Sequence, residues 1–211
     1  MKKPLSLLRS GTLVALATLG AVTTVSLSGC AVLLVGGAVG TALMVSDRRT
    51  SGTQIEDQAI ELKAFTRIRE AVGARGHLNA VSYSRIVLLT GEVASEADRS
   101  AVEQTIARIE NVRSTVNELA VMGSSSLTAR SNDTILTSKV KATYIDAKDV
   151  QANAIKVVTE RATVYLMGRV TEREAARATE LARGVSGVQK VVRVFEILTE
   201  AELAALGAAK P

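Results

Sequence analysis

The sequence predicts an α+β protein made of two tandem modules of order αββαβ, each a small mixed three-stranded sheet packed by two helices. Three observations support this fold class. Residues 89–93 (LTGEV) match residues 166–170 (LMGRV), and Asp57-x-x-Ile60 matches Asp133-x-x-Leu136, so one pattern occurs twice, 76 or 77 positions apart. Each copy opens with apolar residues at every fourth position, which indicates a helix. Segments rich in β-branched residues follow, which is typical of strands.

Residues 1–29 have the order of a signal peptide for export. Basic residues come first, an apolar stretch covers 13–27, and small residues follow. The next residue is the chain's one cysteine, and Leu27-Ser28-Gly29-Cys30 resembles the bacterial lipobox. The resemblance implies cleavage before Cys30, a diacylglycerol on its thiol and acylation of the new amino group. The alternative is an uncleaved transmembrane anchor with an incidental cysteine.

A lipidated Cys30 fixes where the protein works. Two or more acyl chains hold a protein stably on a membrane, whereas one chain does so only marginally. The covalent lipid on Cys30 is the one cofactor we expect. By resemblance to lipoprotein sorting signals, alanine rather than aspartate at position 31 favours the outer membrane, with the protein facing the periplasm.

Residues 30–54 are expected to be a lipidated apolar segment followed by a linker. Residues 31–46 (AVLLVGGAVGTALMVS) are apolar, but they are too short and too rich in glycine to predict a membrane span. We expect this segment to lie at the membrane or to pack on the first module. Residues 47–54 (DRRTSGTQ) read as the polar linker.

The first module is expected over residues 55–123. Its opening helix carries a core face of four residues at a spacing of four, namely Ile60, Ala64, Ile68 and Val72. Strands are predicted at 77–83, 85–93 and 113–122, with a helix at 95–108 between the second and the third. Gly91 marks a bulge or a close backbone approach.

The second module is expected over residues 124–199, and residues 123–126 (GSSS) link it to the first. Leu136, Val140 and Tyr144 form the core face of its first helix, for which Ser131, Asn132 and Asp133 offer caps. Strands are predicted at 152–159, 163–170 and 189–198, with a helix at 171–183. Thr171-x-x-Glu174 forms the better capping box of the two modules, since glutamate reaches back more easily than Asp98. The tail, 200–211, forms a short helix or stays loose.

The αββαβ order, the glycine before the second helix and the pairing of modules resemble the BON domain family. With the lipobox, the chain is similar to the dual-BON outer-membrane lipoproteins of the division- and outer-membrane-stress-associated group. The resemblance covers residues 47–198 and includes the junction Asp47-Arg48-Arg49-Thr50. It implies phospholipid binding, a role in envelope integrity and no catalysis.

The residues themselves speak against an enzyme. The chain has one histidine, His77, and its cysteine is committed to lipid, so we expect no catalytic group, no metal site and no metal cofactor. His77 is expected to be a turn residue that faces solvent. The absence of a basic run and the scarcity of aromatic residues exclude a general nucleic-acid binder.

Charge singles out the second module. The mature chain holds 23 basic and 21 acidic residues, because the signal peptide holds three basic and no acidic ones. Residues 57–122 carry a net charge of −1, with eight basic and nine acidic residues, and residues 124–198 carry +4, with twelve and eight. Anionic headgroups attract basic residues near a membrane surface. The second module is therefore the better candidate for lipid contact, although ordinary scatter of surface charge is an alternative.

The first helix of the second module is the predicted lipid-binding element. Apolar residues beside lysines suit shallow insertion into an anionic bilayer of phosphatidylglycerol or cardiolipin. The predicted lipid-binding residues are Ile135, Leu136, Lys139, Lys141, Tyr144 and Ile145. The alternative is that Ile135 and Ile145 bury against the first module.

The predicted function is that of a non-enzymatic, lipid-anchored envelope protein that binds anionic phospholipid through its second module and supports outer-membrane integrity. The alternative is a protein-interaction or chaperone-like module that binds envelope assembly proteins.

Overall fold

The computed structural model describes residues 47–73 and 76–208, which belong to one compact unit. The predicted signal peptide, Cys30 and the segment 31–46 lie outside the described residues, and so do positions 209–211 of the tail. Among the helices that are described, none combines the length and the apolar character needed to cross a bilayer.

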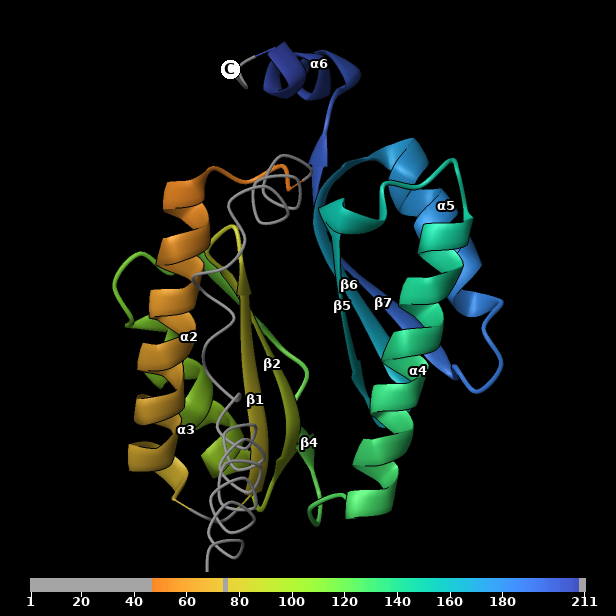
Figure 1. Cartoon of the computed structure of the whole chain (residues 1–211). Coiled ribbons are helices and arrows are strands. Elements are labelled where there is room, and N and C mark those ends of the chain that lie inside the picture. Colours follow the sequence, from red (N-terminus) through yellow and green to blue (C-terminus); the bar gives the residue numbers. More distant parts are fainter. Residues whose placement is uncertain (1–46, 74–75, 209–211) are drawn as a thin grey trace, which may run out of the picture. The chain divides into compact units, whose positions relative to one another are not determined.

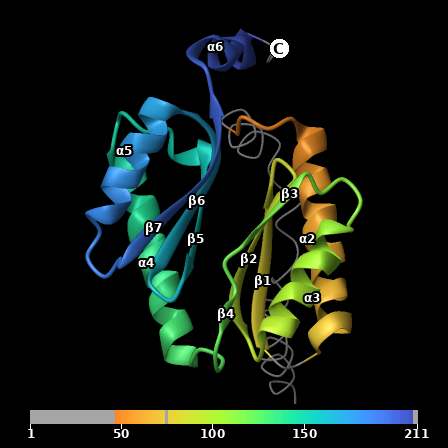
Figure 2. The ribbon, with the colours of Figure 1, turned by 180° about the vertical axis from the view of Figure 1, so that it is seen from behind.

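The first module has the predicted αββαβ order. It contains α2 (Ser51–Val72), β1 (Gly76–Tyr83), β2 (Ile86–Val93), α3 (Glu96–Ala107), β3 (Ser114–Asn117) and β4 (Ala120–Val121). Strand β2 pairs antiparallel with β1 and parallel with β3 and β4. Helices α2 and α3 cover one face of this sheet (Figures 1 and 2). The mixed sheet follows from the connections, because a tight hairpin joins antiparallel strands and a helical crossover joins parallel ones.

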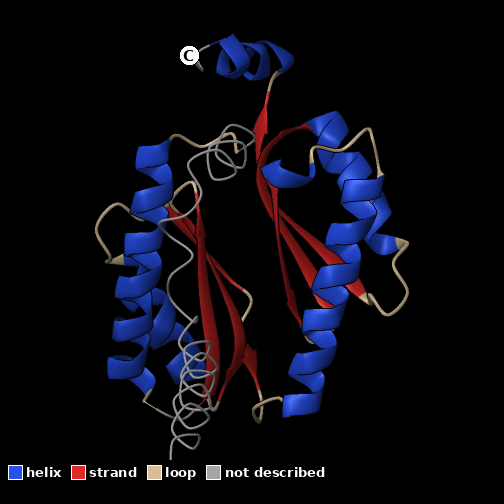
Figure 3. Cartoon of the chain, viewed as in Figure 1, coloured by secondary structure: helices blue, strands red, loops and turns tan. Residues whose placement is uncertain are grey.

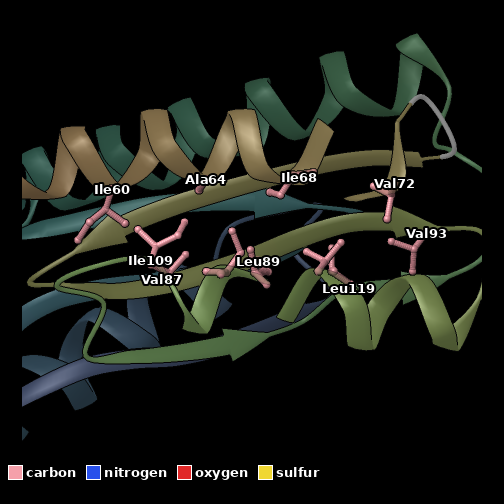
Figure 4. Packing of buried hydrophobic residues seen from close by; sticks show 11 residues of the cluster. Ile60, Ala64, Ile68, Val72, Val87, Leu89, Val93, Ile109 and Leu119 are labelled. Carbon is pink, nitrogen blue, oxygen red and sulfur yellow. The ribbon is translucent and has the colours of Figure 1, made fainter. Parts of the chain in front are cut away.

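Aliphatic side chains fill the core of the first module. The four predicted residues of α2, Ile60, Ala64, Ile68 and Val72, are all buried, and Figure 4 shows them above the side chains of β2. Since successive strand residues point to opposite faces, Val87, Leu89 and Val93 of β2 meet the helices while Leu88 points the other way. The predicted core face of this helix is confirmed.

The second module repeats the arrangement. It contains α4 (Leu127–Asp146), the 3₁₀ helix η1 (Ala152–Ala154), β5 (Ile155–Glu160), β6 (Thr163–Thr171), α5 (Glu172–Arg183) and β7 (Lys190–Leu198), followed by α6 (Glu200–Ala208). Strand β6 lies between an antiparallel β5 and a parallel β7. Figure 3 shows α4 and α5 on one face of this sheet. The α+β fold of two mixed sheets is confirmed.

A buried aspartate explains why Asp57 and Asp133 repeat. In each module the two-residue hairpin turn has two non-glycine residues with positive φ, Ser84-Arg85 (51° and 65°) and Arg161-Ala162 (52° and 56°). That conformation is unfavourable for residues with a Cβ. The side chain of Asp57 accepts hydrogen bonds from the N–H groups of Ser84 and Arg85, both at 2.8 Å. The side chain of Asp133 accepts hydrogen bonds from the N–H groups of Arg161 and Ala162 at the same distance. The first helix of each module thus holds its hairpin turn.

Two predicted strands differ from the structure. The last strand of the first module is interrupted at Glu118 and Leu119, opposite Thr90 and Gly91, because Gly91 (φ 109°) departs from strand geometry. Residues 152–154 form η1 instead of the start of a strand.

Both first helices start earlier than predicted. Helix α2 begins at Ser51, inside the predicted linker, with Thr50 as its N-cap. Helix α4 begins at Leu127 with Ser126 as its N-cap, so Ser131, Asn132 and Asp133 are not caps. A serine or threonine just upstream already satisfies the free N–H groups of the first turn, and the helix therefore extends to it. The tail forms the helical alternative over residues 200–208.

The faces of the two sheets that turn away from the helices pack on each other. A third buried cluster contains Tyr83 and Leu88 of the first module with Tyr165, Met167 and Val194 of the second. Polar contacts surround it: Lys156 Nζ lies 2.8 Å from Glu61 Oε1, and Tyr83 donates to the carbonyl of Ala154 at 3.4 Å. The repeats are therefore joined through an apolar interface as well as through the chain.

Candidate functional site

The exposed face of α4 is the candidate site for lipid contact. Val140 and Tyr144 point into the core of the second module, and the Tyr144 hydroxyl donates to the carbonyl of Ala178 at 2.9 Å. Burial also raises the pKa of the Tyr144 phenol. Leu136 is 7% exposed. The prediction that Leu136 and Tyr144 bind lipid is therefore wrong, because the same helical spacing that makes them core residues removes them from the surface.

The other four predicted residues are exposed. Ile135 and Ile145 are 52% and 73% exposed, and Leu127 in the first turn, which sequence reasoning missed, is 78% exposed. The alternative that Ile135 and Ile145 bury against the first module does not occur. At 100° per residue these three side chains fall within one stripe with the small residues Ser131, Ser138 and Ala142. Lys139 and Lys141 flank the stripe on opposite sides. We call this set of eight residues the α4 stripe.

The α4 stripe borders two hollows in the surface. One, of about 830 Å³, is lined by Ile135, Lys139, Arg161 and the serines of 124–126. The other, of about 310 Å³, is lined by Lys141 and Ile145 together with Lys156 and Arg49. Both hollows therefore combine an exposed isoleucine with cationic side chains.

The hairpin turn of the second module places Arg161 at the larger hollow. Asp133 fixes the backbone N–H of Arg161, and the guanidinium lies 3.3 Å from the fully buried Glu92 carboxylate. Glu92 also accepts the N–H of Ser125 at 3.0 Å, next to the N-cap of α4. Contacts to the first module thus set the position of this edge of the candidate site.

Helix α2 also exposes apolar side chains, which sequence reasoning did not single out. Ile55, Leu62 and Phe65 are 67%, 70% and 59% exposed. The charges around them have both signs: Lys63 pairs with Glu110 at 3.5 Å, and Arg67 pairs with Glu70 at 3.5 Å. Arg69 also lies over the Phe65 ring, 5.4 Å from its centre. We call Ile55, Leu62 and Phe65 the α2 patch, in which apolar side chains lie among charges of both signs. The sequence could have revealed this patch, because Ile55, Leu62 and Phe65 are apolar and do not belong to the core face that recurs every four residues along the helix.

The junction before α2 contacts both modules. Arg48 donates to both carboxylate oxygens of Glu174 in the second module, at 2.6 and 2.7 Å, and is 8% exposed. Arg49 lies 2.8 Å from the Asp57 carboxylate of the first module and stacks 4.1 Å from the ring centre of Tyr83. The predicted linker is thus a folded part of the structure from residue 47 on.

Acid should weaken the junction. The Arg48 guanidinium holds the pKa of Glu174 below its ordinary value, and the capping contacts with Thr171 act in the same direction. A carboxylate with a lowered pKa stabilises the fold above its unfolded-state pKa and loses this contribution as the pH falls through the folded value. We expect Glu174→Gln to destabilise residues 47–211 by about 2 kcal/mol at pH 7, and we expect a smaller difference at about pH 3. Urea unfolding at both pH values measures this. The same loss of unfolding free energy at both pH values would contradict this prediction.

His77 is not the solvent-facing turn residue that we predicted. It lies in β1, partly buried, with Nδ1 3.9 Å from Glu92 Oε2. The register pairs it directly with Glu92 across the hairpin, which turns its side chain toward the sheet. Burial lowers the pKa of His77, and the charge of Arg130 acts in the same direction.

Comparison with known proteins identifies the family. The BON domain model matches residues 57–123 and 132–199. The outer membrane lipoprotein DolP of Haemophilus influenzae is 37% identical over 178 residues, which cover 83% of this chain and 92% of that protein. The chain therefore belongs to the dual-BON outer-membrane lipoproteins, and its location is the outer membrane.

Two further relatives show how wide the similarity is. The 21 kDa hemolysin of Actinobacillus pleuropneumoniae is 30% identical over 71% of this chain and 78% of its own length. The osmotically-inducible protein Y of Escherichia coli is 27% identical over 66% of this chain and 72% of its own length. A solved structure of CdsD, a structural protein of the type III secretion system of Chlamydia trachomatis, is 11% identical over 70% of this chain and 98% of its own, with a TM-score of 0.29.

Proposed function

We propose that this protein is a non-enzymatic envelope component, anchored through lipid on Cys30, that binds anionic phospholipid through the α4 stripe of its second BON domain and so supports outer-membrane integrity. One observation carries the proposal. Leu127, Ile135 and Ile145 are exposed along one side of α4, and Lys139 and Lys141 flank them. A helix of this pattern lies in the interfacial plane of a bilayer, with its apolar side chains among the acyl chains and its lysines at the headgroups.

The anchor and the α4 stripe act together in this proposal. The acyl chains on Cys30 hold the protein at a membrane, so the stripe meets phospholipid at high effective concentration and weak intrinsic affinity suffices. Phosphatidylglycerol and cardiolipin are the expected lipids, because each basic residue near an anionic surface contributes about 1 kcal/mol.

Vesicle sedimentation of unlipidated residues 47–211 tests the proposal, since this segment contains both buried cores and their interface. We expect it to bind vesicles that contain phosphatidylglycerol and not vesicles of neutral lipid. Reversing two lysine charges with Lys139→Glu and Lys141→Glu should lower the partition coefficient at least about tenfold, and Ile135→Glu should weaken binding through the lost apolar insertion.

The matched control is Leu62→Glu on α2, a side chain of similar exposure on the corresponding helix of the first domain. It should leave vesicle binding unchanged. Equal losses in Leu62→Glu and Ile135→Glu would contradict the assignment to α4, and so would equal binding to neutral vesicles.

The α2 patch favours a second candidate function, the binding of an envelope assembly protein. Ile55, Leu62 and Phe65 present an apolar surface among charges of both signs, which resembles a protein-binding surface more than a lipid-binding one. If no vesicle binds and a protein co-purifies in a manner that Leu62→Glu abolishes, this function replaces the first.

A further inference from the structure

Three metal-ligating side chains meet where the two BON domains join. His77 lies in β1, Glu92 lies opposite it in β2, and Glu160 is the last residue of β5 in the second domain. One ligand atom from each lies within 4.8 Å of the other two. Two strands of one sheet and the end of a strand in the other hold the three residues, so their approach depends on regular structure and not on loops.

The electrostatics of this cluster call for an additional positive charge. Glu92 is fully buried and Glu160 is 6% exposed, so two carboxylates lie close together and away from water. Arg161 pairs with Glu92 at 3.3 Å, whereas Glu160 accepts a hydrogen bond from the neutral Asn79 amide, also at 3.3 Å.

Two polar atoms beside the carboxylates are buried without a hydrogen-bond partner. They are Nδ1 of His77 and Oγ1 of Thr90, a residue that is completely buried. Thr90 lies two residues before Glu92, hence on the same face of β2, and it pairs with Asn79 across the hairpin. A native protein seldom leaves such atoms unpaired, and an ion or a water is a common reason when it does.

We propose that His77 Nδ1, Glu92 and Glu160 bind one divalent transition-metal ion of the zinc class, which ties the first BON domain to the second. An imidazole nitrogen with two carboxylate oxygens suits zinc better than magnesium or calcium, which prefer oxygen ligands alone. Zinc binds such atoms at about 2.0–2.2 Å. Ligand atoms up to 4.8 Å apart therefore have to move inward by about 1 Å, which side-chain rotation supplies.

The role of this ion is structural. The three ligands come from both repeats. His77 and Glu92 lie on β1 and β2, the same strands that contribute Tyr83 and Leu88 to the buried interface between the sheets. Counting histidines and cysteines in the sequence argues against a metal site, whereas the fold brings together ligand atoms from both repeats.

Metal binding by the full mature lipoprotein, purified in detergent without a histidine tag, tests the proposal. Equilibrium dialysis with Zn²⁺ should give one ion per chain, and Co²⁺, used as a spectroscopic probe, should acquire visible absorption that Zn²⁺ displaces. His77→Ala and Glu160→Gln should each weaken the binding at least about tenfold. Glu110→Gln, an exposed glutamate on the first domain, is the matched control and should bind as the native chain does.

A second measurement needs no variant. His77 is the only histidine of the chain, so its carbethoxylation by diethyl pyrocarbonate reports on one side chain, and bound Zn²⁺ should slow that reaction at least about tenfold. The proposal is overturned if no stoichiometric Zn²⁺ binds. It is equally overturned if Zn²⁺ binds but leaves the reactivity of His77 unchanged.

Discussion

Replacing Gly91 by alanine is expected to lower the free energy of unfolding of residues 47–211 by about 4 kcal/mol. Gly91 has a φ of 109°, a conformation that residues with a Cβ rarely adopt. A Cβ at this position would also lie 2.0 Å from the carbonyl oxygen of His77 on the neighbouring strand. The strain and the overlap act together, because β1 cannot move away without breaking its pairing with β2.

Two other glycines give the matched series for this measurement. Gly168 is the repeat counterpart of Gly91, and its added Cβ would lie 2.5 Å from the carbonyl oxygen of Ala154, so Gly168→Ala should destabilise the fold by a smaller amount. Gly123 has nothing within 4 Å of an added Cβ, so Gly123→Ala should be close to neutral. Urea unfolding followed by far-ultraviolet circular dichroism measures all three. Similar values for Gly91→Ala and Gly123→Ala would refute the steric explanation.

The second large effect is expected for Asp57→Ala, at about 3–4 kcal/mol of lost stability. The Asp57 carboxylate is 1% exposed and accepts hydrogen bonds from the Ser84 and Arg85 N–H groups and, at 2.6 Å, from the Ser82 hydroxyl. It also pairs with Arg49 of the junction. Alanine would leave the N–H groups of a strained turn without partners and would remove the anion that holds the junction.

Asp133→Ala tests the same idea in the second domain. Asp133 accepts the two turn N–H groups but, among the contacts that the described residues show, has no counterpart to Arg49 or to the Ser82 hydroxyl. Its loss should therefore cost less than that of Asp57, at about 2–3 kcal/mol. The exposed Asp146 at the end of α4 is the control, and Asp146→Ala should change the unfolding free energy by less than about 0.5 kcal/mol. If Asp57→Ala were as mild as Asp146→Ala, the turn-anchoring role would be wrong.

The repeated pattern is built from short-range spacings of apolar residues, and these spacings predicted the fold well. Apolar spacing along α2 and α4 reports which side of a helix is buried, because burial follows the helical period. The same reasoning located the second strands and the capping box of Thr171 and Glu174, which the structure contains in full. It also placed Ile135 and Ile145 outside the core stripe of α4, and both are exposed.

Reasoning from single positions was less reliable for polar residues. Asp133 was expected to cap a helix and instead holds a turn 28 residues further along the chain, while His77 was expected in solvent and faces Glu92. A polar side chain can satisfy its hydrogen bonds in several ways, and only the neighbours brought by folding select among them. Leu136 and Tyr144 were assigned to both core and lipid, and packing decided for the core.

Sequence alone predicts the export signal with its lipobox, and it determined the two modules and their αββαβ order, because short-range patterns encode each of these. Tertiary structure decided how the modules join, through Tyr83, Leu88 and Tyr165 between the sheets and through Arg48 of the junction. It also brought His77, Glu92 and Glu160 close together. Contacts between residues about 70 to 130 positions apart depend on the register and orientation of whole sheets. No local period in the sequence encodes these.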